Sequence, residues 1–228
     1  MVWGFLITTM KEPKLKDCAN ESCDNQFQQF KSTVKVCSMH CAIEFAKKKS
    51  QDDQIKQAKR DKSKHKVDEM SVDKYRSTYI QPLINLLARI IDKGQPCIAS
   101  KVTKGKMAGG HYHAVGHNRT LALNLHNVHI QSYHSNGPQG GQHIKYRHGL
   151  IDVYGDQYTN FVDMYIMQCP PLHLTKEDLV NVKPILQKMV NHYKKLDKEY
   201  TPLERIELRN KLNIELRIYP EEFAKYKK

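Results

Sequence analysis

Hydrophobic and polar positions follow different patterns in successive stretches of the chain. In residues 71–94, apolar side chains recur close to helical spacing, at Tyr79, Leu83, Leu86, Leu87, Ile90 and Ile91. This pattern predicts an amphipathic helix that packs on a core and ends near Gly94, with Pro82 marking a kink or a new first turn. Residues 41–66 contain no Gly or Pro and few apolar positions after Phe45, so they predict a helix that lies largely in solvent.

Two more helices are predicted toward the C-terminus. Residues 174–196 begin with a Thr-x-x-Asp capping box at Thr175. Residues 201–220 begin with Thr201 as the cap, a proline in the first helical position and Glu204 three residues after the cap. Both helices should be amphipathic and pack on the rest of the chain.

Residues 96–160 have a different composition, rich in Gly, His and Asn, with short apolar runs such as TLALNL and NVHI. They predict a hairpin-and-loop region followed by a short helix near IKYRHGLIDVYG. Together with the predicted helices, this region indicates an α+β fold. Eight of the 12 histidines lie within residues 111–148, which makes this region the candidate for chemistry.

Charge suggests the kind of partner. The 228 residues carry 37 Lys and Arg against 24 Asp and Glu, a formal net charge of +13. A chain this basic usually binds a polyanion such as DNA, although a merely basic surface is the alternative. In the helix predicted over residues 41–66 we expect phosphate contacts that do not depend on DNA sequence, from Lys47, Lys48, Lys49, Lys59 and Arg60. The alternative is a solvated linker helix.

The first four of the six cysteines form a C-x4-C-x13-C-x3-C pattern, at Cys18, Cys23, Cys37 and Cys41. Two close pairs separated by a short loop are typical of a tetrahedral Zn²⁺ site. His40 stays open as an alternative fourth ligand. Because so small a unit has little core of its own, we expect it to need the zinc to fold.

The segment MVWGFLITTM at the N-terminus is apolar but too short to span a bilayer, and it lacks the basic leader of a signal peptide. It predicts either a buried strand or an extension ahead of a natural start at Met10. With no other membrane candidate, we expect a protein of the bacterial cytoplasm, where paired cysteines favour metal over disulfide. No small-molecule substrate is expected.

Clustered histidines interleaved with asparagine suggest a metal-assisted hydrolytic site. A divalent ion can hold a phosphate oxygen while a neutral imidazole takes the proton of an attacking water. An asparagine can supply an oxygen ligand or orient the imidazole. For His117, His143 and His148, taken one by one, a polar surface or strand role is the favoured interpretation.

Four motifs in one order resemble a known family. They are VCSMHCAIEFAKKK, a Lys-rich helix, Pro96-Cys97 ahead of Gly110-His111-Tyr112, and LNLHNVHIQSYHSN followed by YRHGLIDVYG. In this order the chain resembles the NinG (Rap) recombination proteins of lambdoid phages and related prophages, over about residues 16–158. The resemblance implies a zinc knuckle, a long basic helix and a core like that of the HNH (ββα-metal) nucleases, to which the residue pattern adds the C-terminal helices. It implies endonucleolytic cleavage of branched DNA, of the Holliday-junction or D-loop type, with Mg²⁺ or Mn²⁺.

The resemblance also assigns roles to residues of the central region. His111 would be the general base, and Asn127 would be the middle Asn that fixes the hairpin and the base. Asn136 stands at the last metal-ligand position. His129 and His113 are further candidates for the catalytic ion or for a phosphate contact.

Tyr112, beside the base, is expected to contact the DNA.

Two departures from the family pattern stand out. The family often holds a structural zinc in a C-x2-C…C-x2-C set, whose positions here read Cys97, Ser100, Ser132 and Ser135. Serine is a poor zinc ligand, so we expect packing, for instance from the C-terminal helices, to hold the hairpin instead. In addition, no carboxylate precedes His111, where many HNH sites place a metal ligand.

These interpretations divide the chain into a four-cysteine zinc knuckle (1–45), a basic helical arm with an apolar helix (46–95), an HNH-like core (96–160) and a C-terminal helical extension (161–228). The leading hypothesis is a phage or prophage endonuclease. One alternative is a DNA-binding protein that recognises branched DNA without cutting it, and another is a His-rich metal-binding protein with no nucleic-acid partner. Junction-cutting enzymes commonly need two active sites, which a homodimer would supply.

Overall fold

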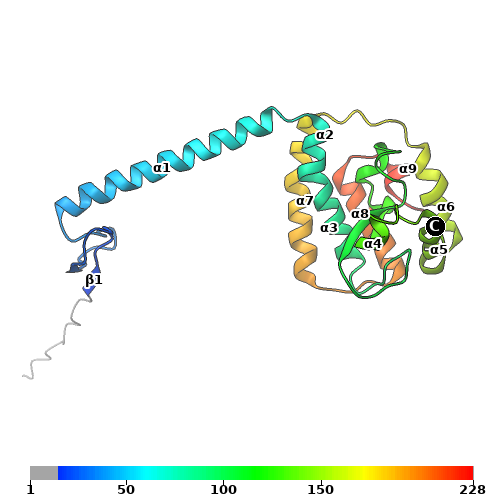
Figure 1. The fold of residues 1–228 in the computed structure, drawn as a ribbon, viewed down its shortest axis with the longest axis horizontal. Helices are drawn as coiled ribbons and strands as arrows, with labels where there is room; N and C mark the ends of the chain where they lie inside the picture. The colour runs from blue at the N-terminus through cyan, green and yellow to red at the C-terminus, as the bar shows by residue number, and fades with distance from the viewer. Residues whose placement is uncertain (1–14, 228) are drawn as a thin grey trace, which may run out of the picture. The chain divides into compact units, whose positions relative to one another are not determined.

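The computed structural model describes residues 15–227, which separate into two compact units that divide between Glu69 and Met70 (Figure 1). The apolar segment of residues 1–10, predicted to be a strand or an extension, lies outside the described residues. Within the part of the chain that is described, none of the helices combines the length and apolar character needed to cross a membrane.

The N-terminal unit contains a small hairpin and one long helix. Strand β1 (Leu15–Asp17) pairs antiparallel with β2 (Gln26–Gln28). Helix α1 (Met39–Asp68) follows, capped by the Ser38 side chain, which accepts a hydrogen bond from the Cys41 N–H. The solvent-exposed helix predicted over residues 41–66 is confirmed, since Cys41 is the buried residue of α1.

The C-terminal unit begins with one nearly continuous helical stretch. Helix α2 (Val72–Tyr75) passes through a π-helical turn, η1 (Arg76–Ile80), into α3 (Gln81–Ile91). Pro82 stands in the first turn of α3. Of the two predicted alternatives, a kink or a new first turn, the structure shows the second. Because proline lacks an N–H and cannot continue the hydrogen-bond ladder, the helix changes its pairing just before this residue.

A second hairpin lies at the centre of this unit. Strand β3 (Met107–His111) pairs antiparallel with β4 (Val128–Ser132), with Gly110 opposite His129. The elements around the hairpin are η2 (Thr120–Leu123), η3 (Leu125–Asn127), α4 (Tyr133–Asn136), α5 (His143–Tyr154), α6 (Asp156–Asn160), η4 (Phe161–Tyr165) and η5 (Ile166–Gln168). The predicted hairpin region with a short helix after it is therefore present.

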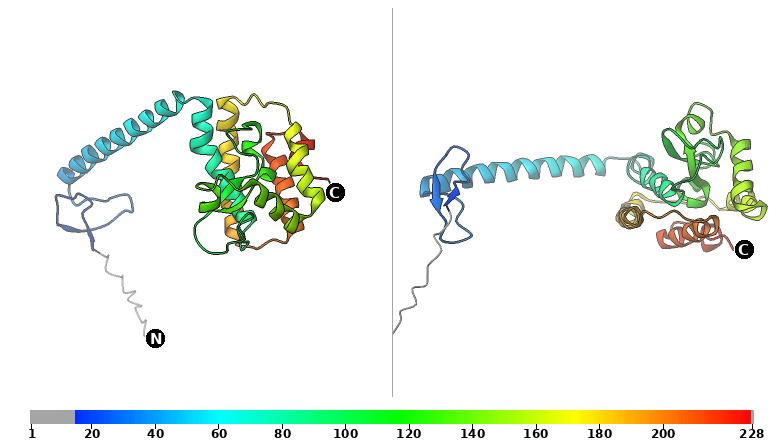
Figure 2. Two further views of the ribbon diagram at one scale, coloured as in Figure 1. Left: turned by 45° about the vertical axis from the view of Figure 1, so that its right-hand side comes forward. Right: turned by 90° about the horizontal axis from the view of Figure 1, so that it is seen from below.

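Three helices complete the chain: α7 (Lys176–Leu196), α8 (Pro202–Leu216) and α9 (Glu221–Ala224). The capping boxes predicted at Thr175 and Thr201 are both formed. Helix α7 runs beside α3 (Figures 1 and 2). Helix α8 contacts η3, which directly precedes β4.

A buried ion pair joins the C-terminal helices to the hairpin. The Asp92 carboxylate at the end of α3 accepts hydrogen bonds from Arg209 of α8 at 2.8 Å and from the Ile130 N–H of β4 at 2.9 Å. Arg209 is fully buried and also donates to the Leu125 carbonyl. Residues 96–160 and 161–228 consequently form one unit, because side chains of the second segment complete the core of the first.

Candidate functional site

The four N-terminal cysteines converge at the turn of the first hairpin. The sulfur atoms of Cys18, Cys23, Cys37 and Cys41 all lie within 4.8 Å of one another. Cys18 follows β1, and Cys41 lies in the first turn of α1, so the turn and the helix start bring together residues that are up to 23 positions apart. The Cys37 N–H also donates to Cys18 Sγ at 3.4 Å, which fixes the loop before α1.

The thiols of this cluster differ in acidity. Interactions with the Ser38 hydroxyl and then the Asn20 side chain lower the pKa of Cys41 to about 6, whereas burial raises the pKa of Cys37 to about 12. Cys41 is therefore the thiol that is most readily available as the thiolate that binds metal. His40 does not belong to the cluster, because its ring is exposed and faces Glu44. Four thiols at this spacing could bind a zinc ion.

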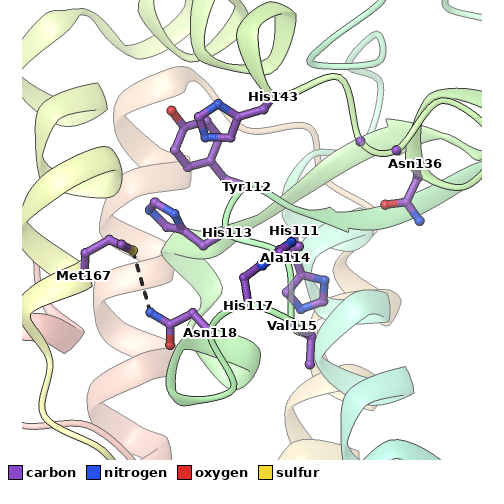
Figure 3. A pocket seen from close by; sticks show the side chains of 12 residues that line it. His111, Tyr112, His113, Ala114, Val115, His117, Asn118, Asn136, His143 and Met167 are labelled. Atoms are coloured by element: carbon purple, nitrogen blue, oxygen red, sulfur yellow. Dashed lines mark hydrogen bonds between the residues drawn. The ribbon is translucent and has the colours of Figure 1, made fainter.

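A second candidate site is a cavity of about 690 Å³ beside the end of β3 (Figure 3). Its walls include His111, His113, Asn136 and His143. The structure thus gathers three of the residues predicted for catalysis or metal binding around one open space. His117 and His143, for which a polar surface role was favoured, are exposed and also line this cavity.

His111 is held in one tautomer. Its Nε2 lies 3.0 Å from the Ala122 carbonyl oxygen and 3.1 Å from Gln81 Nε2. The Gln81 amide already donates to Asn85 Oδ1 and to the Ala122 carbonyl. Because a carbonyl only accepts, the His111 Nε2–H points at Ala122, and Nδ1 keeps its lone pair. Burial lowers the pKa of His111 below its ordinary value, partly opposed by Ala122, so the ring is neutral near pH 7.

Asn127 fixes the chain that follows the base. Its side chain is fully buried, accepts a hydrogen bond from the His113 N–H at 2.7 Å, and donates to the carbonyls of His113 and Leu121. All the polar atoms of this amide are therefore used to tie η2 and the segment after β3 together. This is the position to which the family pattern assigns the hairpin-fixing asparagine.

His113 is positioned in a similar way to His111. Its Nε2 lies 2.8 Å from the Val162 carbonyl oxygen, which leaves Nδ1 as the nitrogen with a lone pair. Burial lowers the pKa of His113, although the Val162 carbonyl and Asp163 oppose this. The His113 ring lines the same cavity as His111, which is two residues earlier in the chain.

Tyr112 and His129 lie deeper than predicted. Tyr112 is only 4% exposed, and its hydroxyl donates to Asp163 Oδ1 at 2.8 Å, so its polar end belongs to the wall rather than to a DNA-facing surface. His129 is fully buried with its Nδ1 3.1 Å from the Tyr146 hydroxyl, which donates to the Gly110 carbonyl. Burial holds the pKa of His129 well below its ordinary value. The two ring nitrogens face the hydroxyls of Tyr146 and Tyr158, so both are engaged within the core, and His129 is not one of the ligands that we propose.

The four positions at which the resemblance placed a structural zinc do come together. Ser132 Oγ donates to Ser135 Oγ at 3.0 Å, and the Ser100 N–H donates to Cys97 Sγ at 3.3 Å. Burial raises the pKa of Cys97, but hydrogen bonds from Ser100 and from the Ser132 backbone outweigh it and lower the pKa to about 7. The cluster nevertheless offers a single thiol. Within residues 15–227, the four N-terminal cysteines are the one group of three or more His, Cys, Asp or Glu close enough to hold an ion.

The predicted phosphate contacts all lie on α1. Lys47, Lys49, Lys59 and Arg60 are exposed on the helix surface. Lys48 is also exposed but forms an ion pair with Glu21 of the cysteine-containing unit. The basic arm thus presents four of its five predicted side chains without an ion pair among the described residues.

Comparison with known proteins gives one result. The family model described as Bacteriophage Lambda NinG protein matches residues 10–199. No curated protein sequence and no solved structure is significantly similar to the chain. The matched stretch covers both the cysteine cluster and the cavity.

Proposed function

The chain belongs to the NinG family of bacteriophage lambda proteins, which makes it a phage recombination-related protein, and from this premise we propose that it is a metal-dependent endonuclease that cuts branched DNA. The observation that carries the proposal is His111. Its Nε2–H is occupied by the Ala122 carbonyl and its ring is neutral, so Nδ1 is available as a base beside an open cavity.

In the proposed reaction, His111 Nδ1 takes a proton from a water molecule in the cavity. The water oxygen forms a bond to the phosphorus of the scissile phosphodiester, and the bond from phosphorus to the leaving oxygen breaks. Asn127 keeps the base in place by tying the segment after β3 to η2. The positive charge of the chain attracts the DNA and supports phosphate contacts along α1.

A divalent ion such as Mg²⁺ or Mn²⁺, when bound, would stabilise the charge that develops on the phosphate and the leaving oxygen. Such ions prefer oxygen ligands. Asn136 offers one, since its Oδ1 faces the space that a side chain on Gly110 would fill, 2.8 Å from the Cβ position. His113 also lines the cavity and is the second candidate ligand.

The alternative is a protein that binds branched DNA without cutting it. It is favoured by one observation: among the described residues, the cavity shows no group of three His, Cys, Asp or Glu side chains close enough to hold an ion. Both proposals need the same basic surface, so only an assay of cleavage separates them.

The test compares cleavage of a labelled four-way junction and a matched linear duplex in Mg²⁺ and in Mn²⁺. We expect His111→Ala to lower the junction cleavage rate by about 100-fold or more while junction binding persists, because a general base contributes about that factor. His148→Ala, an exposed histidine on α5, is the matched control and should cut at the normal rate. Tight junction binding by the unaltered protein with no cutting in either metal would establish the binding protein instead.

The role of the basic arm has its own test. Replacing Lys47 and Lys49 by Glu reverses two charges on α1. The change should weaken junction binding and make it less dependent on salt, because fewer phosphates are neutralised. The control reverses two exposed lysines of α7, Lys188 and Lys195, and so makes the same change in net charge. If both pairs of substitutions weaken binding equally, α1 acts only as a linker.

A further inference from the structure

One buried polar atom beside the cavity has no partner. Gln131 lies in β4 and is fully buried, and its Nε2 donates to the Gly141 carbonyl at 2.6 Å. A carbonyl can only accept, so this bond determines which end of the amide is nitrogen. The other end, Oε1, accepts no hydrogen bond from any described residue. An unsatisfied buried acceptor is costly and calls for an explanation.

The orphan oxygen points into the space left by a missing side chain. Gln131 Oε1 occupies the place that a Cβ on Gly110 would take, and Asn136 Oδ1 lies 2.8 Å from the same point. The two amide oxygens come from β4 and α4, and they meet over the glycine that precedes the proposed base, His111. Any side chain at position 110 would have to displace both oxygens.

We propose that Gln131 Oε1 and Asn136 Oδ1 together bind the divalent cation of this site. The inference rests on the proposed function and names a ligand that the sequence pattern did not. Mg²⁺ and Mn²⁺ bind amide and carboxylate oxygens, and a cation would satisfy Oε1 where no N–H or O–H reaches it. The oxygen of Gln131 thereby stands where a carboxylate on residue 110 would otherwise reach the ion.

The two oxygens are neutral, which has a consequence for affinity. Without a carboxylate, the protein alone holds the ion weakly, and the phosphate of the bound DNA supplies further oxygen ligands. We therefore expect Mn²⁺ to bind more tightly when a four-way junction is present than when it is absent.

A purely structural role for Gln131 makes a different prediction from a ligand role. Gln131→Glu keeps an oxygen at the same place and adds a negative charge, so a ligand role predicts tighter Mn²⁺ binding. A structural role, with a buried water satisfying Oε1, predicts no change in Mn²⁺ affinity, because the new charge would have no cation to meet. Gln131→Met keeps the length of the side chain and removes the oxygen.

The experiment measures Mn²⁺ binding to the full, zinc-loaded chain from the paramagnetic resonance signal of free Mn²⁺, with and without a non-cleaved junction. We expect Gln131→Met to weaken Mn²⁺ binding at least tenfold and Gln131→Glu to strengthen it at least tenfold. Gln139→Met alters an exposed glutamine of the neighbouring loop and should bind Mn²⁺ normally. Asn136→Ala, at a partly exposed position, should weaken binding as Gln131→Met does even if the latter folds poorly.

Three outcomes decide the matter, with junction cleavage measured in parallel. Normal Mn²⁺ affinity in folded Gln131→Met and Gln131→Glu, or no Mn²⁺ binding by the unaltered chain with the junction present, overturns the cation site. If the chain cuts DNA but its Mn²⁺ affinity does not change with substitutions of Gln131, the proposed cation site is wrong and the proposed nuclease activity is correct. If Mn²⁺ affinity depends on Gln131 but the junction is not cut, the proposed cation site is correct and the proposed nuclease activity is wrong.

Discussion

The two small hairpins of this molecule are held in opposite ways. The first, β1–β2, has little buried surface of its own, and four thiols gather at its turn. The second, β3–β4, has one cysteine, Cys97, close to three serines, Ser100, Ser132 and Ser135, and it is enclosed by helices. A short hairpin can therefore be fixed by sulfur ligands close in sequence, or by side chains that arrive from far along the chain.

The second arrangement depends on close contact. Gly109 of β3 lies against the α3 backbone, with its Cβ position 2.7 Å from the Asn85 carbonyl oxygen. Arg209 of α8 reaches across 117 positions to Asp92. These contacts hold the hairpin that carries His111 beside the cavity.

The largest expected effect is on the first hairpin. Replacing Cys23 and Cys37 by Ser, or removing zinc with a chelator, should unfold residues 15–38 altogether, because a unit with so small a core depends on its metal. The C-terminal unit should keep its thermal transition. Zinc content, limited proteolysis and circular dichroism measure this, with Cys169→Ser, a buried cysteine outside the cluster, as the control. A metal-free hairpin that resists protease would contradict the prediction.

The next effect is on the second hairpin. Arg209→Met leaves the buried Asp92 carboxylate without its closest cation and should lower the free energy of unfolding of the C-terminal unit by about 3–5 kcal/mol. Urea denaturation followed by circular dichroism measures the change. Lys211→Met, an exposed position on the same helix, should change it by no more than about 0.5 kcal/mol. Equal values for the two variants would show that the ion pair does not hold the hairpin.

Much of this architecture could be predicted from local patterns. The exposed helix α1, the two capped helices and the cysteine cluster all follow from signals within a few dozen residues, namely spacing, caps and cysteine pairs. The surroundings of the base could not be predicted. His111 is oriented beside Gln81, 30 positions earlier, and His113 by the Val162 carbonyl, 49 positions later.

Burial explains why the predicted site residues differ from those that the structure places at the cavity. His129 and Tyr112 stand in motifs that suggest surface chemistry, yet tertiary packing encloses both. Spacing along the chain says which side chains are near one another, but their exposure depends on elements that fold over them. The same packing brings Gln131 to Gly110 and leaves its oxygen unpaired, a feature visible only in three dimensions.

A smaller effect tests how tightly the helices enclose the hairpin region. A Cβ on Gly149 of α5 would overlap the Ile98 carbonyl oxygen. Gly149→Ala should therefore destabilise the C-terminal unit by about 1–3 kcal/mol, despite the better helix propensity of Ala. Gly116→Ala is the control, since nothing lies within 4 Å of its Cβ position. A Gly149→Ala protein as stable as the control would mean that α5 can move away from the Ile98 backbone at little cost.

The smallest effect separates the two C-terminal helices. Thr201 caps α8, which carries Arg209, whereas Thr175 caps α7, which packs beside α3. Replacing either Thr by Ala should cost about 1 kcal/mol of stability, and Thr201→Ser should restore it. Because α8 alone reaches the hairpin through Asp92, we expect Thr201→Ala to speed hydrogen exchange at the Ile130 amide more than Thr175→Ala does. If both substitutions speed exchange at Ile130 equally, the hairpin opens only when the whole C-terminal unit unfolds. In that case α8 does not stabilise the hairpin separately from the rest of the unit.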